Sequence, residues 1–302
     1  FNPFALGFQP LLVGMLLGVF LYWGWDSGVS VNEETENPRS TPGRAVVVAN
    51  FVLITVFLLV SVAAQSYAGP ARLAKNADDV FAGGLAHDVL GPLHFLLTLA
   101  VLTSATAATQ TTILPAARTA LSMARRGALP ARYATINETN QVPGYATVVV
   151  GILSVVWYVA IVNISTHVLA DVVVGVGFLV ALGYGFAGLA CAIYFRRELG
   201  KSVANLFTMG ILPMVGALTL LGVCGRGMVY YADPENLASQ PIWGLGIPDW
   251  IVILFVASGI IFMLIARAKL PDFFRRERRQ VAGEPFAATS QGAALAAPDA
   301  RR

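Results

Sequence analysis

The sequence predicts an all-α integral membrane protein. The chain has 302 residues, of which 56% are hydrophobic and only 12% are charged. Apolar runs of about 20 residues recur along it, which is the length that an α-helix needs to cross roughly 30 Å of hydrocarbon. Transmembrane strands would instead give alternating segments of about ten residues, and the sequence has none. The runs are therefore interpreted as transmembrane helices.

Seven runs qualify as spans. They place a transmembrane region at residues 1–268, followed by a cytoplasmic tail at 269–302. The tail is first charged and then rich in Ala, Gly, Ser and Pro, so it cannot bury a core and is expected to be disordered. The predicted spans cover residues 10–31, 45–67, 91–117, 145–163, 168–195, 206–229 and 250–268.

The basic residues predict the orientation of these spans. With the start of the chain outside, all but Arg72, Lys75 and Arg226 of the 20 lysines and arginines fall on the inner side. Basic residues in short loops stay in the cytoplasm. We therefore expect a multi-pass protein of the cell (plasma) membrane with a cytoplasmic C-terminus, in contact with membrane lipid.

Several classes of function lack support in the sequence. Topology accounts for the net charge of +3, so nothing separate indicates nucleic-acid binding. Cys191 and Cys224 lie in or near apolar spans, which argues against a disulfide framework. His87, His94 and His167 show no metal-ligand spacing. Without a nucleophile beside a base, a metal cluster or a phosphate loop, we expect neither an enzyme nor a bound metal or cofactor.

The first span carries an interruption that a plain membrane helix does not need. Between Phe20 and Gly28 it holds a carboxylate, Asp26, and two glycines within five positions, Gly24 and Gly28. Such residues are costly in hydrocarbon unless the backbone opens there and serves a function. Transporters form substrate sites from broken helices of this kind. The interruption therefore predicts a binding site.

The third span is unusually polar for a membrane helix. Its hydroxyl and amide side chains are Thr98, Thr103, Ser104, Thr106, Thr109, Gln110, Thr111 and Thr112. Serine and threonine can bond back to carbonyls of their own helix, so each one alone costs little. As a group they indicate either close helix packing or a wet, ion-lined face. The span continues into residues 116–130, where Gly127 and Pro130 are expected to end a cytoplasmic helix.

Three blocks carry a resemblance to a known family. The first runs from Phe20 to Pro38, the second from Arg118 to Pro130, and the third from Asn140 to Pro143. In this order they resemble the broken sixth helix, the signature after the eighth helix and the lead into the ninth helix of permeases. The family is the amino acid, polyamine and organocation (APC) superfamily. The blocks and the spans after them cover nearly the whole chain.

The resemblance implies a LeuT-type fold, in which helices one to five and six to ten are inverted repeats among twelve helices. This chain would supply the second repeat, whose five helices begin with the broken one, and two additional helices. Its missing partner would be the first five helices of the same protein. The implied function is that of a fragment of a secondary active transporter. It would move amino acids or related amines by alternating access, with proton coupling or exchange.

The same resemblance implies a substrate site at the broken helix. In the family, the unwound centre offers backbone carbonyls to the substrate ammonium, which suits the partial charges at the ends of half-helices. Phe20 falls where the family often has an aromatic gate, and Thr112 approaches the substrate on the permease register. The implied substrate-binding residues are Phe20, Leu21, Tyr22, Trp23, Gly24 and Thr112.

Gating or proton coupling is assigned to Phe20, Trp25 and Asp26. Two interpretations of Asp26 remain open. As a cap, its carboxylate would accept amide hydrogen bonds from the second half-helix. As a coupling residue, it would take up and release a proton, since removal from water favours the neutral form of an acid.

A cation site in the third span also has two interpretations. Thr103, Ser104 and Thr106 resemble a sodium site of leucine-transporter-type symporters, and hydroxyl and carbonyl oxygens suit a hard cation. A register counted back from Arg118 moves the site about one turn, toward Thr106 and Thr109. The alternative is ordinary helix packing. The coupling ion is therefore expected to be H⁺ or Na⁺.

Other assignments stay open at this point. Glu33 and Glu34 form either a solvated helix end or an inner-gate ion pair. The chain as a whole could be a non-transporting half that needs a partner chain. A seven-helix receptor shares the predicted topology, but retinal binding would require a lysine in the middle of the last span, and Lys269 lies at its inner end.

Overall fold

The structure is a computed structural model, and it describes residues 7–32, 35–37, 40–76, 84–137, 139–165, 167–271 and 273–274. Glu33, Glu34 and the predicted tail from residue 275 onward lie outside the described residues. Within the described part the secondary structure is helical, apart from two isolated β-bridges. This confirms the predicted all-α class.

Six helical stretches are long and apolar enough to cross a membrane, which confirms an integral membrane protein. The first predicted span differs from the others. It consists of the 14-residue helix α1 (Phe8–Leu21), a turn, and the four-residue helix α2 (Ser27–Ser30). The long helices are α3 (Thr41–Lys75), α5 (Phe95–Arg125), α6 (Gly144–Ile164), α7 (Val168–Tyr194), α9 (Leu212–Tyr231) and α10 (Ile247–Lys269).

Short helical elements link or extend these spans. α4 (Leu85–Leu90) and the 3₁₀-helix η3 (Gly91–His94) precede α5, and α8 (Val203–Asn205) with a π-helical turn (Leu206–Ile211) precedes α9. The π-helical turn is continuous with α9, so the sixth predicted span is one continuous helical stretch. Single 3₁₀ turns at Ala131–Ala134, Leu199–Lys201 and Pro234–Asn236 lie in the connections.

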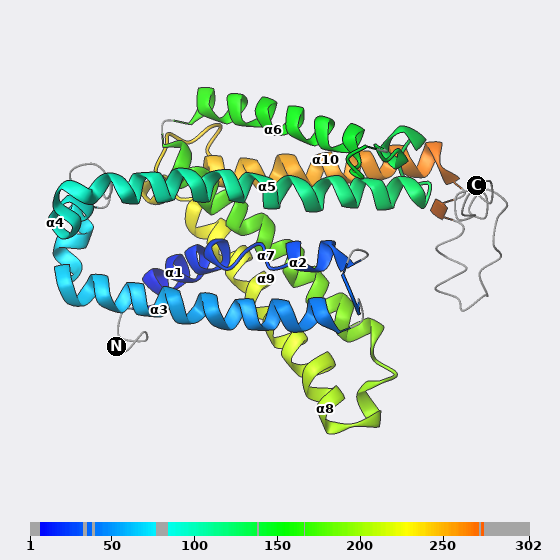
Figure 1. Cartoon of the computed structure of the whole chain (residues 1–302), viewed down its shortest axis with the longest axis horizontal. Helices are drawn as coiled ribbons and strands as arrows, with labels where there is room; N and C mark the ends of the chain where they lie inside the picture. The colour runs from blue at the N-terminus through cyan, green and yellow to red at the C-terminus, as the bar shows by residue number, and fades with distance from the viewer. Residues whose placement is uncertain are drawn as a thin grey trace.

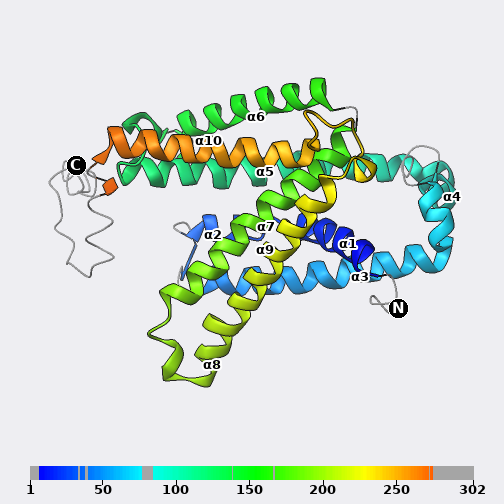
Figure 2. The same cartoon turned by 180° about the vertical axis from the view of Figure 1, so that it is seen from behind.

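Helix α7 is the centre of the arrangement, because it packs against α9, α10 and α1. In Figures 1 and 2 the pair α7 and α9 runs obliquely to the long helices α3 and α5. α5 lies beside α6, and α2 contacts both α3 and α5. The broken helix α1–α2 therefore reaches from the α7 bundle to the α3 and α5 helices.

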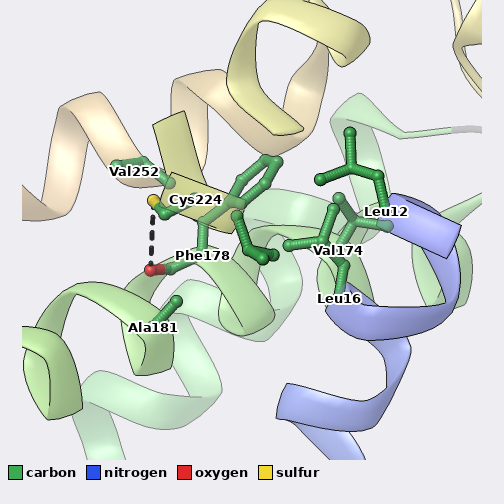
Figure 3. Close-up of a cluster of buried hydrophobic side chains, with 8 residues drawn as sticks. Leu12, Leu16, Val174, Phe178, Ala181, Cys224 and Val252 are labelled. Atoms are coloured by element: carbon green, nitrogen blue, oxygen red, sulfur yellow. Dashed lines mark hydrogen bonds between the residues drawn. The ribbon is translucent and has the colours of Figure 1, made fainter. Parts of the chain in front are cut away.

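A buried apolar cluster fixes α1 to this bundle (Figure 3). Cys224 lies in it as a packing residue, and its thiol donates to the Phe178 carbonyl over 3.7 Å. Close packing of such side chains stabilises the contact through van der Waals attraction. The cluster consists of Leu12, Leu16, Val174, Phe178, Ala181, Val223, Cys224 and Val252.

Small residues let the helices of the bundle approach closely. A Cβ added at Gly188 of α7 would lie 2.8 Å from the Pro213 carbonyl oxygen of α9. A Cβ at Gly227 of α9 would lie 2.7 Å from the Phe178 ring. Small residues at such contacts are how membrane helices pack without a hydrophobic driving force between them. These glycines therefore position α7 and, through it, the broken helix.

Two acidic side chains are buried in the same bundle. Asp171 of α7 is only 3% exposed and accepts a 2.7 Å hydrogen bond from Ser165 Oγ. Ser165 Oγ lies 3.3 Å from Ser239 Oγ, which extends the polar cluster to the α9–α10 connection. Asp249, in the first turn of α10, is 2% exposed, and neither of its oxygens has a hydrogen-bond partner in the described part of the chain.

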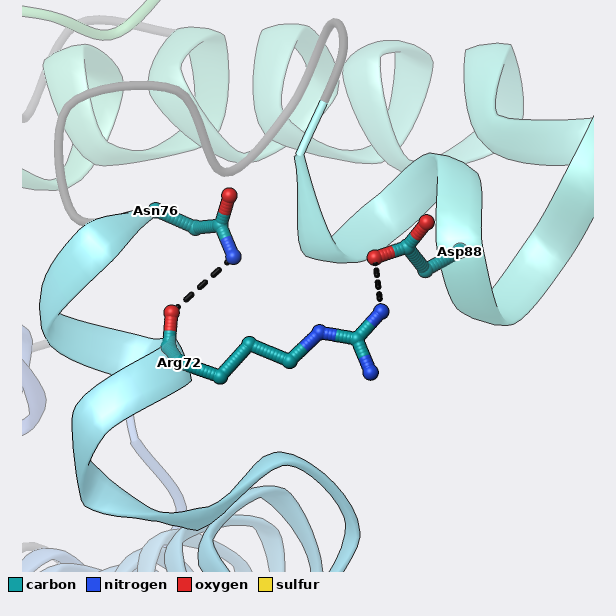
Figure 4. Close-up of polar contacts among 3 residues, drawn as sticks. All are labelled: Arg72, Asn76 and Asp88. Carbon is teal, nitrogen blue, oxygen red and sulfur yellow. Dashed lines mark hydrogen bonds and ion pairs between the residues drawn. The ribbon is translucent and has the colours of Figure 1, made fainter.

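The ends of α5 and the link before it follow the sequence signals. α5 ends at Arg125, and Gly127 adopts a φ of 81° while its N–H bonds to the Ala124 carbonyl, as glycine does at helix C-termini. On the other side, Arg72 at the end of α3 pairs with Asp88 of α4 (Figure 4).

Candidate substrate site at the broken helix

The break in the first span lies at residues 22–26, as the sequence predicts. α1 ends at Leu21, and the N–H of the next residue, Tyr22, donates a hydrogen bond to the Gly18 carbonyl over 3.0 Å. α2 begins at Ser27, whose N–H bonds to the Gly24 carbonyl over 3.1 Å. Gly24 has a φ of 107°, a conformation that side-chain-bearing residues rarely adopt. The glycine therefore makes the turn between the two half-helices possible.

Carbonyl groups in the turn are left without helix partners. Of the predicted substrate carbonyls, the one of Phe20 accepts the Trp23 N–H over 3.2 Å. Those of Leu21, Tyr22 and Trp23 accept no hydrogen bond from any residue that the structure describes. An unpaired backbone carbonyl carries a partial negative charge and needs a donor or water. These three oxygens can accept hydrogen bonds from a cationic or polar ligand.

Tyr184 of α7 contacts the turn, and no sequence pattern described above includes it. Its hydroxyl donates to Asp26 Oδ1 over 2.9 Å and accepts the Gly24 N–H over 3.4 Å. Its ring also packs against Trp25, with the ring centroids 5.1 Å apart. The available signal was a tyrosine between two glycines, Gly183 and Gly185, in the middle of an apolar span.

Asp26 occupies the N-cap position of α2, but its side chain makes no capping hydrogen bond. Its carboxylate accepts the Tyr184 hydroxyl, while its backbone carbonyl accepts the N–H and the hydroxyl of Ser30 over 3.0 Å each. The side chain thus links the turn to α7 rather than closing the end of α2. Its role in gating or proton coupling stays a prediction.

Aromatic rings surround the turn. Phe20 and Trp23 have ring centroids 6.4 Å apart, and Tyr22 meets Phe57 of α3 edge to face at 5.4 Å. Trp23 and Trp25 are each 40% exposed. Edge-to-face and tilted pairs of this kind stabilise contacts beyond the area they bury. The rings therefore fix the turn between α3 and α7 while leaving it accessible to a ligand.

Helix α5 reaches the second half of the broken helix at Thr111. The Ser27 hydroxyl donates to the Thr111 carbonyl over 3.1 Å. Thr112, a predicted substrate residue, directs its hydroxyl to the Ala108 carbonyl of its own helix over 2.8 Å. Thr112 therefore lies next to the α2 contact in sequence, and its contact with a substrate stays a prediction.

The hydroxyls of the predicted cation site lie on different faces of α5. Residues seven apart in an α-helix fall within about 20° of each other, and residues five apart about 140° apart. Ser104 therefore shares the face of Thr111, whereas Thr106 lines a groove against α6 together with Pro143 and Thr147. The Thr103 and Thr106 hydroxyls bond back to Leu99, Ala100 and Leu102 carbonyls over 2.9–3.1 Å.

A helix unwound over aromatic residues and unpaired carbonyls is a feature with which membrane transporters build substrate sites. Comparison of the sequence with protein families agrees. The model of the family described as "Amino acid permease" matches residues 1–280, which is nearly the whole chain. The chain belongs to this family, and the resemblance to APC permeases is confirmed.

Several curated relatives of the chain are named as transporters. "Cationic amino acid transporter 8, vacuolar" of Arabidopsis thaliana is 23% identical over 89% of this chain and 42% of the relative. "Cationic amino acid transporter 4, vacuolar" of the same plant is 26% identical over 50% of this chain and 25% of the relative. An "uncharacterized transporter" of Mycobacterium tuberculosis is 33% identical over 48% of this chain and 34% of the relative.

The matches thus span between a quarter and about two fifths of the length of these relatives. No solved structure gives a significant match to the chain. The family is therefore established by the sequence comparison, and the multi-pass membrane character by the six membrane-length helices.

Proposed function

We propose that this chain contributes one wall of the substrate site of a secondary amino acid transporter. The observation that carries the proposal is the turn at Gly24, which leaves the Leu21, Tyr22 and Trp23 carbonyls without partners among the described residues. Such carbonyls complement an ammonium group, because they present partial negative charge in a site with few competing donors. The opposite wall is proposed to come from helices of the same permease that this sequence does not contain.

The proposed substrate is an amino acid or a related amine. The α-ammonium group would bind the carbonyls of the turn, and Phe20 and Trp25 would cover it as a gate. Names of the Arabidopsis relatives specify cationic amino acids, so lysine and arginine are the first candidates. The substrate carboxylate would require donors from the missing wall.

The proposed transport cycle is alternating access with proton coupling or exchange. Asp26 is the candidate coupling residue, since its carboxylate connects the turn to Tyr184 of α7 by a 2.9 Å hydrogen bond. A change in the charge of Asp26 would alter that bond and with it the contact between the turn and the bundle. Sodium coupling at Thr103, Ser104 and Thr106 remains the alternative, and the plasma membrane is the proposed location.

Uptake by the full-length permease containing this chain, reconstituted in liposomes, tests the proposal. We expect accumulation of an amino acid when the outside is acidic, and Asp26→Asn should flatten the dependence of uptake on pH. Asn keeps the size and an acceptor oxygen, so the turn should persist. Folded permease that takes up no amino acid or amine would refute the function. Normal uptake with an unchanged pH profile would remove only the coupling role of Asp26.

A further inference from the structure

Two histidines meet at the bend between α4 and α5, on the link that the basic residues predict to be outside. His87 lies in α4 and His94 in η3, and their ring centroids are 5.4 Å apart. In a straight helix, residues seven apart are separated by about 10 Å along the axis. The rings come together because Gly91 has a φ of 53° and Pro92 starts a new 3₁₀ turn. Sequence spacing alone does not reveal this pair.

The hydrogen bonding of His94 prepares it as a ligand. Its Nδ1 lies 3.0 Å from the Gly91 carbonyl oxygen. A carbonyl oxygen can only accept, so Nδ1 carries the proton and Nε2 keeps its lone pair in the neutral ring. Metal-bound histidines nearly always donate their other N–H to a carboxylate, a carbonyl or water in this way. His94 thus has the outer partner that an imidazole ligand requires.

The separation of the rings also suits a shared ion. Two imidazole nitrogens at about 2.0–2.1 Å from one tetrahedral metal place their ring centres about 5 Å apart. Arg72 of α3 pairs with Asp88, which follows His87 in α4, so the arginine charge is compensated (Figure 4). The same pair ties α4 to α3 and holds the bend in place.

We propose that His87 and His94 form a two-histidine site for a late first-row divalent ion such as Zn²⁺ or Cu²⁺. Imidazole nitrogen is a preferred ligand of these ions. Within the described residues no group of three or more His, Cys, Asp or Glu side chains could hold a metal, so the proposed site has two histidine ligands from this part of the chain. The site is separate from the broken helix and does not depend on which substrate the permease carries.

Titration of the purified chain with Zn²⁺, after removal of any affinity tag, tests the site by calorimetry. We expect one ion per chain. Losing an outer partner of a metal ligand already costs about 10- to 100-fold in affinity, so His87→Ala and His94→Ala should each weaken binding at least about ten-fold. His167→Ala is the matched control, because it removes the third histidine of the chain, at the start of α7, and should leave binding unchanged.

Electron paramagnetic resonance with Cu²⁺ identifies the ligands independently of affinity. The wild-type chain should show coupling to two imidazole nitrogens, and each single variant to one. Circular dichroism of the variants checks that the helices persist. Absence of Zn²⁺ binding, binding that is lost with His167 or that survives removal of both other histidines, or a Cu²⁺ spectrum with a single nitrogen in the wild type would each overturn the proposal.

Discussion

At the scale of single residues, the site depends on one tyrosine. The Tyr184 hydroxyl links Gly24 to Asp26, by accepting a hydrogen bond from the Gly24 N–H and donating one to the Asp26 carboxylate. The carboxylate of Asp26 would otherwise lack the donor that an acceptor in a membrane protein requires. The sequence shows that Asp26 is an unusual charge in an apolar span. It does not identify the hydrogen-bond partner of Asp26, which lies 158 residues further along the chain.

Tyr184→Phe removes this hydroxyl and keeps the ring that packs on Trp25. A net hydrogen bond is worth about 0.5–1.5 kcal/mol, so we expect the rate of uptake to fall roughly two- to ten-fold without loss of the fold. Tyr194→Phe is the matched control, because Tyr194 lies on the same helix and is highly exposed. Equal uptake by the two variants in reconstituted permease would contradict the assigned role of Tyr184.

At the scale of elements, glycines have two different structural roles. Gly24 provides a backbone conformation, whereas Gly188 and Gly227 provide space between helices. The sequence predicted the first, because a glycine beside a carboxylate in an apolar run is anomalous. The role of Gly188 and Gly227 could not be predicted from the sequence, because tertiary packing decides which face of α7 contacts α9.

Gly188→Ala should destabilise the bundle. The new methyl group would lie 2.8 Å from the Pro213 carbonyl oxygen and 3.0 Å from the Ala217 methyl group. Overpacking of this kind costs about 1–3 kcal/mol, so thermal unfolding in detergent should shift down by several degrees. Gly183→Ala on the same helix has nothing within 4 Å of the added Cβ and should not lower the unfolding temperature. Equal shifts would show that the α7–α9 contact is looser than described.

The polar helix α5 shows where inference from sequence stops. Its polar side chains were interpreted either as helix-packing residues or as a wet, ion-lined face, and the threonine hydroxyls bond back to carbonyls of their own helix. Periodicity identifies α5 as a membrane helix, yet its neighbours decide which of its faces is used. Ser104 shares a face with the α2 contact, and Thr106 faces α6.

At the scale of the whole molecule, composition predicted the all-α membrane class, which the structure confirms, and the basic residues predict an orientation that stays a prediction. The transmembrane helices were predictable from local hydrophobicity, and the break in the first span was predictable from its glycines. The central place of α7 was not, because α1, α9 and α10 converge on it from distant parts of the chain. The burial of Asp171 in α7 and of Asp249 in α10 was also not predicted.

The orientation of the molecule can be measured by labelling in intact cells. Trp243 in the α9–α10 connection is 89% exposed and is predicted to be outside, whereas Lys201 before α8 is predicted to be inside. A membrane-impermeant thiol reagent should label Trp243→Cys in intact cells, but Lys201→Cys only after permeabilisation. Cys191→Ser and Cys224→Ser in the background remove the native thiols. The reverse pattern would invert the proposed topology.

The central claim is that the turn at Gly24 forms the substrate wall, and substrate binding by two alanine variants tests it most directly. In Gly24→Ala the added methyl group has no neighbour within 4 Å, but the alanine must adopt a φ of 107°, which costs about 1–3 kcal/mol. Gly14→Ala, in the middle of α1, also meets nothing and keeps helical geometry. We predict that Gly24→Ala weakens binding of the transported amino acid at least about five-fold while Gly14→Ala binds as wild type. Wild-type affinity in folded Gly24→Ala permease would contradict the claim.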